Sequence, residues 1–281
     1  MTARAPVLKT LKLYVGGKFI RSESGRVLTV PSRNGVPMYA ARTSRKDVRG
    51  AVEIARKAQT GWANRTAFNR GQILYRLAEM LEDRATVLPT SDEDVVAATD
   101  RTVHYAGWSD KITALLSTLN PVAATYVNYS RIRPLGIVAA FPSPDASLLG
   151  LVDALCACTV MGNTVLLVVD PKNAELATAL AECLATCDMP AGVVNVLTGD
   201  VAEVMEHVGN QDDVDGLLVG EGAITEEGLK QADHQGAQVL RRIIRGEDAS
   251  RPCGPIELSR LAEVQTVWMS AYEPHAAGGG Y

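Results

Sequence analysis

The sequence predicts an α/β fold in which a parallel sheet is joined by helical crossovers. From residue 134 onward, short apolar runs alternate with helical stretches, which is typical of βαβ units. Before that point, two long amphipathic stretches predict helices. The chain has 281 residues, of which 47% are hydrophobic, so it can bury one large core or two smaller ones.

The first two helices are predicted at residues 47–62 and 70–84. Ser44 and Asp47 form a plausible capping pair at the start of the first helix. Each stretch carries an apolar stripe at helical spacing. The stripes are Val48, Ala51, Val52 and Ala55, then Ile73, Leu74, Leu77, Ala78 and Leu81.

Four apolar runs predict the strands of the parallel sheet: residues 136–141, 164–169, 193–197 and 217–219. Before them, in residues 123–133, aromatic and β-branched residues alternate with polar ones, which indicates a half-exposed strand pair. Residues 246–255 are rich in polar and turn-forming residues and interrupt the pattern.

Charge and composition argue against two classes of partner. The formal net charge is -4 and the pI is near 5.7, so the chain lacks the basic stripe that nucleic acids or anionic membranes attract. No apolar stretch has the roughly 20 residues that cross a bilayer, and the first residues do not resemble a signal peptide. We therefore expect a cytoplasmic protein, in which the five cysteines are reduced.

Seven segments resemble blocks of the aldehyde dehydrogenase family and occur in the family's order. They are residues 13–19, 47–62, 70–84, 104–111, 162–165, 190–196 and 198–199. One such block would be weak evidence, whereas seven in order are specific. The resemblance covers most of the chain and implies a Rossmann-like cofactor domain with N-terminal helices and an oligomerisation β-hairpin.

The resemblance divides the chain into five parts. Residues 1–122 hold the N-terminal strands and helices, 123–135 the oligomerisation hairpin, and 136–245 the Rossmann-like core. Residues 246–260 form a linker where the family has its catalytic domain, and residues 261–281 form a returning strand and tail. The chain is thus expected to be a shortened member that lacks most of the catalytic domain.

The blocks that carry the family's chemistry are missing. Its thiolate comes from a Gly-Gln-x-Cys-like block and its water-activating carboxylate from a Glu-Leu-Gly-Gly block, and neither occurs here. Cys253 is the cysteine nearest the expected place, and Arg251 beside it would favour a thiolate. No recognisable base accompanies Cys253, so the resemblance assigns no catalytic residue. The four histidines are scattered and show no metal-ligand spacing.

The position of the family's oxyanion-hole asparagine is changed. An ungapped count back from Gly162 places Asp145 where the family's Pro-Trp-Asn-Phe-Pro block has its asparagine. A carboxylate there would repel an oxyanion. The alternative role for Asp145 is a turn or a helix N-cap after Pro144.

The cofactor pocket is reduced to remnants. Val168 stands where the family has the lysine of its Lys-Pro-Ser-Glu block, and Lys172 or Asp170 could replace it only with a shifted backbone. Gly220 marks what is left of the phosphate turn, which aligns with residues 218–221 or with a register one residue away. Neither register keeps the family's serine, and Glu221 follows Gly220. We therefore expect no cofactor, with NAD or NADP binding as the less favoured possibility.

Residues 261–270 resemble the family's returning strand, and residues 278–281 resemble the block that follows it. The family's last strand, which crosses to a neighbouring subunit, is then expected to be absent. An open sheet edge or an unpaired hairpin at residues 126–133 would recruit another chain.

Three hypotheses follow from the sequence. The first is a catalytically inactive homologue that acts as a structural or regulatory subunit, bound to a full-length aldehyde dehydrogenase or to itself through the hairpin. The second is an NAD-dependent oxidoreductase acting on aldehydes through a degenerate site that uses Cys253. The third is a decaying paralogue without a role.

Overall fold

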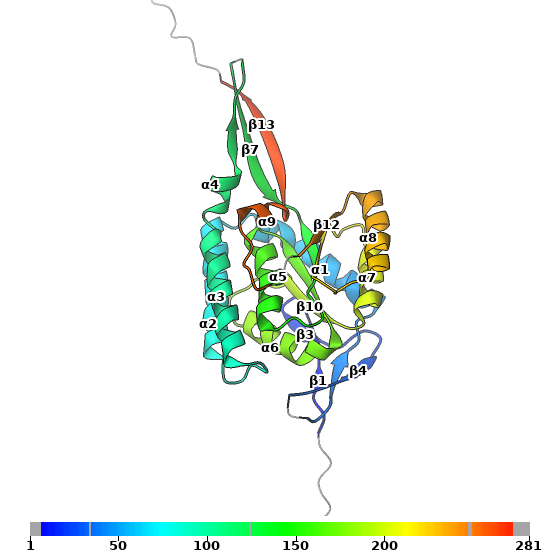
Figure 1. Ribbon diagram of the computed structural model, residues 1–281. Helices are drawn as coiled ribbons and strands as arrows, with labels where there is room; N and C mark the ends of the chain where they lie inside the picture. The colour runs from blue at the N-terminus through cyan, green and yellow to red at the C-terminus, as the bar shows by residue number, and fades with distance from the viewer. Residues whose placement is uncertain (1–6, 34, 124, 247–248, 272–281) are drawn as a thin grey trace, which may run out of the picture.

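The centre of the protein is a seven-stranded sheet with helices on both faces (Figure 1). The computed structural model describes residues 7–33, 35–123, 125–246 and 249–271. The sheet has the order β12-β11-β8-β9-β10-β2-β3. Its strands are β2 (Leu13–Val15), β3 (Lys18–Ile20), β8 (Ile137–Phe141), β9 (Thr164–Val169), β10 (Val194–Thr198), β11 (Gly216–Val219) and β12 (Arg242–Arg245).

The five strands from β8 to β12 run parallel, and β2 pairs antiparallel with β10. Numbered along the chain, these five strands lie in the order 3-2-1-4-5 read from β10 to β12, which is the Rossmann order. The predicted α/β fold is confirmed, and the four predicted strands are found within one residue of their expected bounds. The direction of the crossovers reverses between β8 and β11.

Alternate residues of each strand pack into two different cores. Val138, Val165 and Val196 belong to a core shared with α2, α3, α5 and α6, whereas Ile137 and Leu166 belong to one shared with α1, α7 and α8. A sheet buried on both faces needs apolar residues at successive positions, which is why β9 reads as an unbroken apolar run.

The two predicted N-terminal helices are present as α1 (Arg45–Ala63) and α2 (Ala67–Asp83). The predicted capping pair is confirmed. The Ser44 hydroxyl accepts from the Asp47 N–H at 3.3 Å, and the Asp47 carboxylate accepts from the Ser44 N–H at 2.8 Å. Asp47 also accepts from the Ser22 hydroxyl at 2.6 Å, which fastens the preceding strands to the helix.

The other helices connect the strands or cover the sheet. They are α3 (Asp92–Trp108), α4 (Ile112–Leu116), α5 (Leu148–Val160), η1 (Pro171–Asn173), α6 (Ala174–Leu184), α7 (Val201–Gly209), α8 (Glu226–Val239) and α9 (Pro255–Ser259). A small sheet near the N-terminus contains β1 (Thr10–Leu11), β4 (Val27–Val30) and β5 (Met38–Ala41). Among the described residues, no helix combines the length and apolar character needed to cross a membrane.

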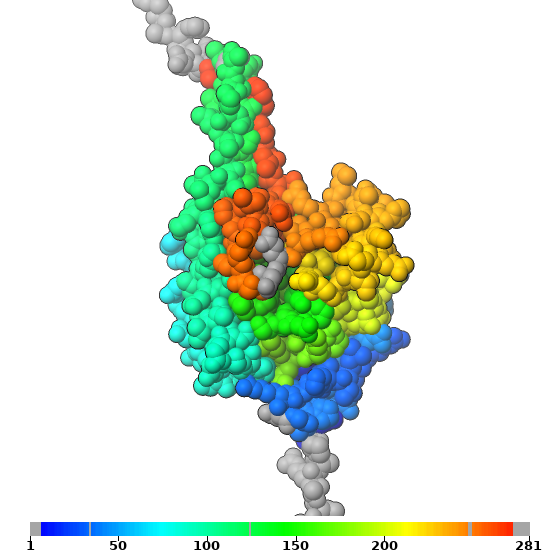
Figure 2. Space-filling view, in the orientation of Figure 1, coloured from blue at the N-terminus to red at the C-terminus, as the bar shows by residue number. Residues whose placement is uncertain are grey.

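A third sheet, of order β13-β7-β6, stands clear of the body (Figures 1 and 2). It contains β6 (Thr118–Asn120), β7 (Tyr126–Pro134) and β13 (Ala262–Ser270). The first strand of the hairpin therefore lies before the expected start at residue 123. Of the two alternatives expected here, the unpaired hairpin is wrong, because β13 pairs antiparallel with β7 along all nine residues, whereas an open sheet edge remains at β13 in the described part of the chain. Residues 278–281 lie outside the described residues.

The described part of the expected linker, residues 249–260, forms a cap on the core together with Leu261. Leu258 and Leu261 are buried at 0% and 2% exposure. Asn163, itself fully buried, donates to the Leu261 carbonyl at 2.8 Å and accepts from the Gly136 N–H at 2.9 Å. One side chain thus joins the start of β8 to the start of β13.

Candidate functional site

A cavity of about 410 Å³ lies where β8, β11 and β12 end. Its walls come from the loops after these strands, from α5 and from residues 249–261. Ligands of open parallel sheets bind outside the carboxyl ends of the strands, where the crossovers reverse direction. The cavity occupies that place between β8 and β11, so it is the candidate site of this fold.

Asp145 lies in the turn after β8, at the rim of the cavity. Its side chain is 91% exposed, and one carboxylate oxygen lies 2.6 Å from the Lys172 ammonium. The turn predicted as one of its alternative roles is found, whereas the N-cap of α5 is Ser147. An exposed carboxylate paired with a lysine does not donate a hydrogen bond to an oxyanion.

Asp94 supplies the cap that Ser147 does not provide. This α3 carboxylate accepts from the Leu148 N–H at 2.9 Å, the Leu149 N–H at 3.1 Å and the Ser147 hydroxyl at 2.7 Å. Helix α5 begins beside the cavity, and its first backbone N–H groups therefore already donate to Asp94. No local sequence signal pointed to Asp94, because the cap comes from a different helix.

The three positions at the end of β9 that the sequence analysis considered are engaged in contacts within the protein. Val168 is buried in the strand at 1% exposure, and its side chain belongs to the core that β9 shares with α1 and α7. Asp170 caps the short η1 helix by accepting from the Lys172 N–H at 2.9 Å. Lys172 turns toward Asp145, and this bond raises the pKa of the ammonium. Val168 therefore packs within the strand, Asp170 caps η1 and Lys172 forms an ion pair with Asp145.

Gly220 permits a close approach between two strand ends. Its N–H donates to the Phe141 carbonyl at 2.8 Å, and an added Cβ would lie 2.7 Å from the Ser143 nitrogen. The glycine is thus needed for contact between the loops after β11 and β8, whatever else binds there.

Carboxylates surround the start of α8. Glu221 follows Gly220 and lines the cavity, and Glu226 and Glu227 form the first turn of the helix. The N-cap Thr225 accepts from the Gly228 N–H at 3.2 Å. Acidic residues stabilise a helix N-terminus, but they also cancel the positive potential that would hold a pyrophosphate. These residues do not fit the diphosphate of a dinucleotide.

A buried charged cluster closes the inner end of the site. Arg101 donates to Asp153, and the Tyr105 hydroxyl donates to the same carboxylate oxygen at 2.8 Å. Burial raises the pKa of Asp153 and of Tyr105. Arg101 also donates to the Ala249 carbonyl at 2.7 Å. The cluster therefore anchors the cap segment to α3 and α5.

Cys253 lines the cavity, but its surroundings do not favour a thiolate. Burial is the main effect and raises the pKa of the thiol, against which Tyr105 and Arg101 act in the opposite direction. The His104 ring lies near the Cys253 carbonyl, and its Nε2 accepts from the Trp108 indole at 2.9 Å. That nitrogen is already occupied, so it does not serve as a base for the thiol.

The other four thiols lie in the core. Burial raises the pKa of Cys183 and Cys187 to about 11 and that of Cys156 and Cys158 further. In these places the four cysteines pack as small hydrophobic side chains.

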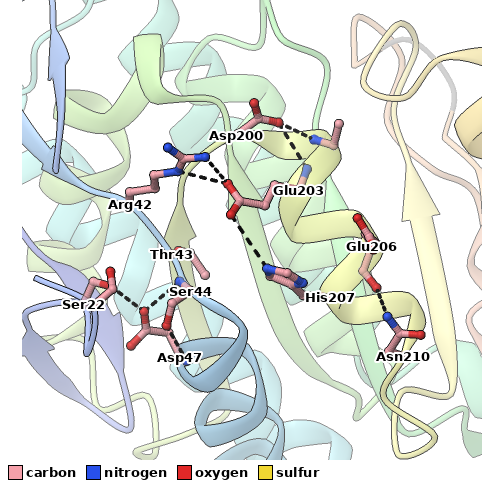
Figure 3. A network of polar contacts seen from close by, with 12 residues as sticks. Ser22, Arg42, Thr43, Ser44, Asp47, Asp200, Glu203, Glu206, His207 and Asn210 are labelled. Carbon is pink, nitrogen blue, oxygen red and sulfur yellow. Dashed lines mark hydrogen bonds and ion pairs between the residues drawn. The ribbon is translucent and has the colours of Figure 1, made fainter. Parts of the chain in front are cut away.

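A second polar network lies at the carboxyl end of β10 (Figure 3). The Arg42 Nε lies 3.0 Å from a Glu203 oxygen, and His207 approaches the other Glu203 oxygen at 3.9 Å. The Thr43 N–H and hydroxyl both donate to the Thr198 carbonyl, at 2.9 Å and 2.7 Å. Because every contact joins neighbouring elements, we interpret this network as structural.

The described residues contain no group of three or more His, Cys, Asp or Glu side chains placed to hold a metal ion. His104 and His207 take part in the contacts given above. His275 lies outside the part of the chain that the structure describes.

Comparisons with known proteins agree with this geometry. The model of the aldehyde dehydrogenase family matches residues 19–241. The putative aldehyde dehydrogenase DhaS of Bacillus subtilis is 31% identical over 225 residues, which are 73% of this chain and 44% of that protein. The α-ketoglutaric semialdehyde dehydrogenase of Bacillus subtilis is 24% identical over 247 residues, 82% of this chain and 47% of that protein.

Solved structures show the same fold. HpcC from Thermus thermophilus superposes with a TM-score of 0.73 at 24% identity, covering 84% of this chain and 47% of that one. The NAD+ complex of aldehyde dehydrogenase from Bacillus cereus gives a TM-score of 0.71 at 22% identity, covering 84% and 50%. The chain thus spans about half the length of the proteins it matches.

Proposed function

We propose that this chain, which belongs to the aldehyde dehydrogenase family, is a non-catalytic subunit that associates with a full-length member of the family. One contrast carries the proposal. The scaffold of the family is kept over residues 19–241, and a projecting sheet is kept beside it, while the groups at the candidate site are engaged in structural contacts.

Three features of the site support the absence of catalysis. The thiol that lines the cavity has a pKa raised by burial. The carboxylate at the oxyanion position is tied to Lys172. Carboxylates occupy the place where a helix N-terminus would receive phosphates. The first would weaken nucleophilic attack, the second oxyanion stabilisation and the third cofactor binding. A single substitution would therefore not restore the reaction.

The projecting sheet supports association. Several large apolar side chains on it are exposed, among them Leu119 at 77%, Trp268 at 62% and Met269 at 49%. Exposed apolar groups that gather on one element mark interaction surfaces more often than single exposed residues do. A subunit that contributes no chemistry would use this sheet to join the oligomer.

The test is purification of the tagged chain from its own cells, followed by native mass spectrometry. We expect a full-length aldehyde dehydrogenase in fixed stoichiometry. Leu119 and Met269 lie on one face of the sheet, so the double variant Leu119→Asp/Met269→Asp should lose that partner. The control is Phe68→Asp, which changes an exposed large apolar side chain on α2, away from the projecting sheet. A monomer indifferent to every such enzyme would overturn the proposal.

The cavity beside Cys253 favours one alternative function, an NAD-dependent oxidoreductase acting on aldehydes. It requires NADH formation that depends on aldehyde and is lost in Cys253→Ala. Cys187→Ala is the control, because this thiol lies in the core away from the cavity. Equal activity in both variants, or none in the parent, would exclude Cys253 as the nucleophile.

A further inference from the structure

The carboxylate of Asp153 has one oxygen without a partner in the described part of the chain. Both of its donors, the Arg101 guanidinium and the Tyr105 hydroxyl, bind the Oδ1 atom. The described residues contain few fully enclosed side-chain polar atoms that lack a partner, and Oδ2 of Asp153 is not one of them. Because Asp153 lines the cavity, its Oδ2 is a hydrogen-bond acceptor open to that space.

This acceptor lies deep in the protein. The Asp153 side chain is only 14% exposed, and that of its partner Arg101 is 6% exposed. Burial is also the main influence on Asp153 and raises the pKa of its carboxyl group. A polar atom at such a place costs free energy unless a donor binds it. A molecule that fills the cavity and excludes water must therefore supply the donor itself.

The charge around Asp153 favours a donor without a charge of its own. Arg101 already balances the carboxylate, so an ammonium group at Oδ2 would lie close to a guanidinium of the same sign. An anionic group would meet the carboxylate oxygen directly and would be repelled. A neutral hydroxyl avoids both costs.

The remaining charged groups of the lining do not favour an ion either. Asp145 pairs with Lys172, and Glu257 accepts from Arg251 at 3.0 Å. The other three are exposed, so water and salt weaken their interactions with a ligand. They are Glu221, Arg245 and Arg260.

Most of the other wall residues are apolar. Phe141 and Ile244 come from the ends of β8 and β12 and are almost fully buried. Gly150, Ala154 and Ala157 follow one another at helical spacing along α5, and their small side chains leave room beside the helix. A volume of about 410 Å³ lies within the range of about 300–1,000 Å³ that is typical of sites for small molecules.

We propose that the cavity binds an uncharged, largely apolar alcohol or phenol, whose hydroxyl donates to Oδ2 of Asp153. The apolar part of the ligand lies against α5 and the strand ends. An aldehyde or an ether of the same shape has no donor and leaves Oδ2 buried and unpaired, so the site rejects it. The inference goes beyond the proposed function, because it requires neither a partner subunit nor a reaction.

Titration calorimetry tests the need for a donor. It compares phenols of increasing size with their methyl ethers, which keep the ring and lose the donor. The phenols are phenol itself, 4-propylphenol and 2-naphthol. At least one of them should bind the purified chain at a single site, roughly tenfold more tightly than its ether. The proposal fails if none of the phenols binds, or if each phenol binds no better than its ether.

Asp153→Asn tests the acceptor itself. The amide oxygen can keep the bonds from Arg101 and Tyr105, and the amide nitrogen then places a donor where Oδ2 was. The preference should reverse, because the phenol loses roughly tenfold in affinity while the ether, which accepts from the amide, does not weaken. Equal weakening of both ligands would assign Asp153 a structural role only and would overturn the proposal.

Ala154→Leu tests the place of binding and leaves the side chains around Asp153 unchanged. The larger side chain fills part of the cavity from α5, so the affinities for phenol and ether should both fall roughly tenfold or more. The matched control is Ala63→Leu, another half-buried alanine, at the end of α1 and outside the lining. Unchanged binding by Ala154→Leu would contradict the proposed site.

Circular dichroism checks that each variant keeps the fold. If Asp153→Asn does not fold, the comparison of phenol with ether and the Ala154→Leu variant still decide the question. The chain is measured alone, so the outcome is independent of whether an aldehyde dehydrogenase is captured.

Discussion

The Lys172 ammonium and the Asp145 carboxylate lie 2.6 Å apart and join the loop after β9 to the loop after β8. Lys172 is a cation near the end of β9, and Asp145 lies at the rim of the cavity. The pair neutralises both charges at the mouth of the site. A dinucleotide would have to break it and then meet Glu221 and the first turn of α8.

The first prediction concerns dinucleotide binding. Titration calorimetry of the parent with NAD+ should show no binding tighter than about 1 mM, since like charges oppose the diphosphate. The triple variant Glu221→Gln/Glu226→Gln/Glu227→Gln should bind roughly tenfold more tightly than the parent. The matched control replaces three exposed carboxylates elsewhere: Glu53, Asp83 and Glu93. Submillimolar binding by the parent would contradict this account of the site.

The second prediction concerns the cap of α5. Burial raises the pKa of Asp94, but hydrogen bonds from Thr90, Ser147 and two backbone N–H groups outweigh it and hold the pKa below its usual value. Asp94→Ala should lower the free energy of unfolding by about 1–2 kcal/mol at neutral pH, a figure reduced for partial solvent exposure. Asp92→Ala, an exposed carboxylate in the same turn, is the control.

The pH dependence of this cap has a definite sign. A carboxyl group with a lowered folded-state pKa stabilises the fold above its unfolded-state pKa, and the contribution is lost as pH falls through the folded-state pKa. The difference in free energy of unfolding between the parent and Asp94→Ala, measured with urea, should therefore become smaller in acid. A gap that is constant with pH would show that the carboxylate charge plays no part.

The third prediction concerns Asn163. Asn163→Ala leaves the Gly136 N–H and the Leu261 carbonyl without this partner inside the protein, which should cost about 2–4 kcal/mol. Urea unfolding measures the loss. Asn210→Ala removes an exposed bond to the Glu206 carbonyl and should change stability by less than about 0.5 kcal/mol. Equal effects would mean that burial of the Asn163 bonds is unimportant.

The fourth prediction concerns thiol chemistry. Iodoacetamide should modify Cys253 first, because the other four cysteines are buried, and the rate should rise with pH beyond the usual thiol range, because burial raises the pKa of Cys253. Peptide mass spectrometry locates the modified residue, and unfolded protein gives the reference rate. Modification at neutral pH that is faster than in the unfolded chain would indicate an activated thiolate instead.

Much of the fold was predictable because it rests on local patterns. The capping pair of Ser44 and Asp47 indicates the start of α1, and the apolar run at residues 164–169 is long enough to predict β9. The family blocks indicated the order of the segments along the chain, but not the role of each side chain. Asn163 belonged to a block recognised by resemblance, yet its bonds to Gly136 and Leu261 depend on segments 27 and 98 residues away.

The site was less predictable, since its contacts cross between elements. The sequence showed that Asp145 and Lys172 stand at altered positions, but not that they bind each other across 27 residues. The sequence did not predict that β13 pairs with β7. The residues of a strand indicate which face is buried, but not which distant strand it pairs with.

The pairing of β7 with β13 also has a consequence for the chain during its synthesis. Ser130 and Thr266, whose hydroxyls lie 2.9 Å apart across these strands, are 136 residues apart in the chain. At the usual rates of synthesis, β7 leaves the ribosome roughly 7 to 27 s before its partner strand exists. During that interval its edge is open to any strand nearby. The nascent chain is therefore most exposed to mispairing, and most dependent on chaperones, well before its last strand is made.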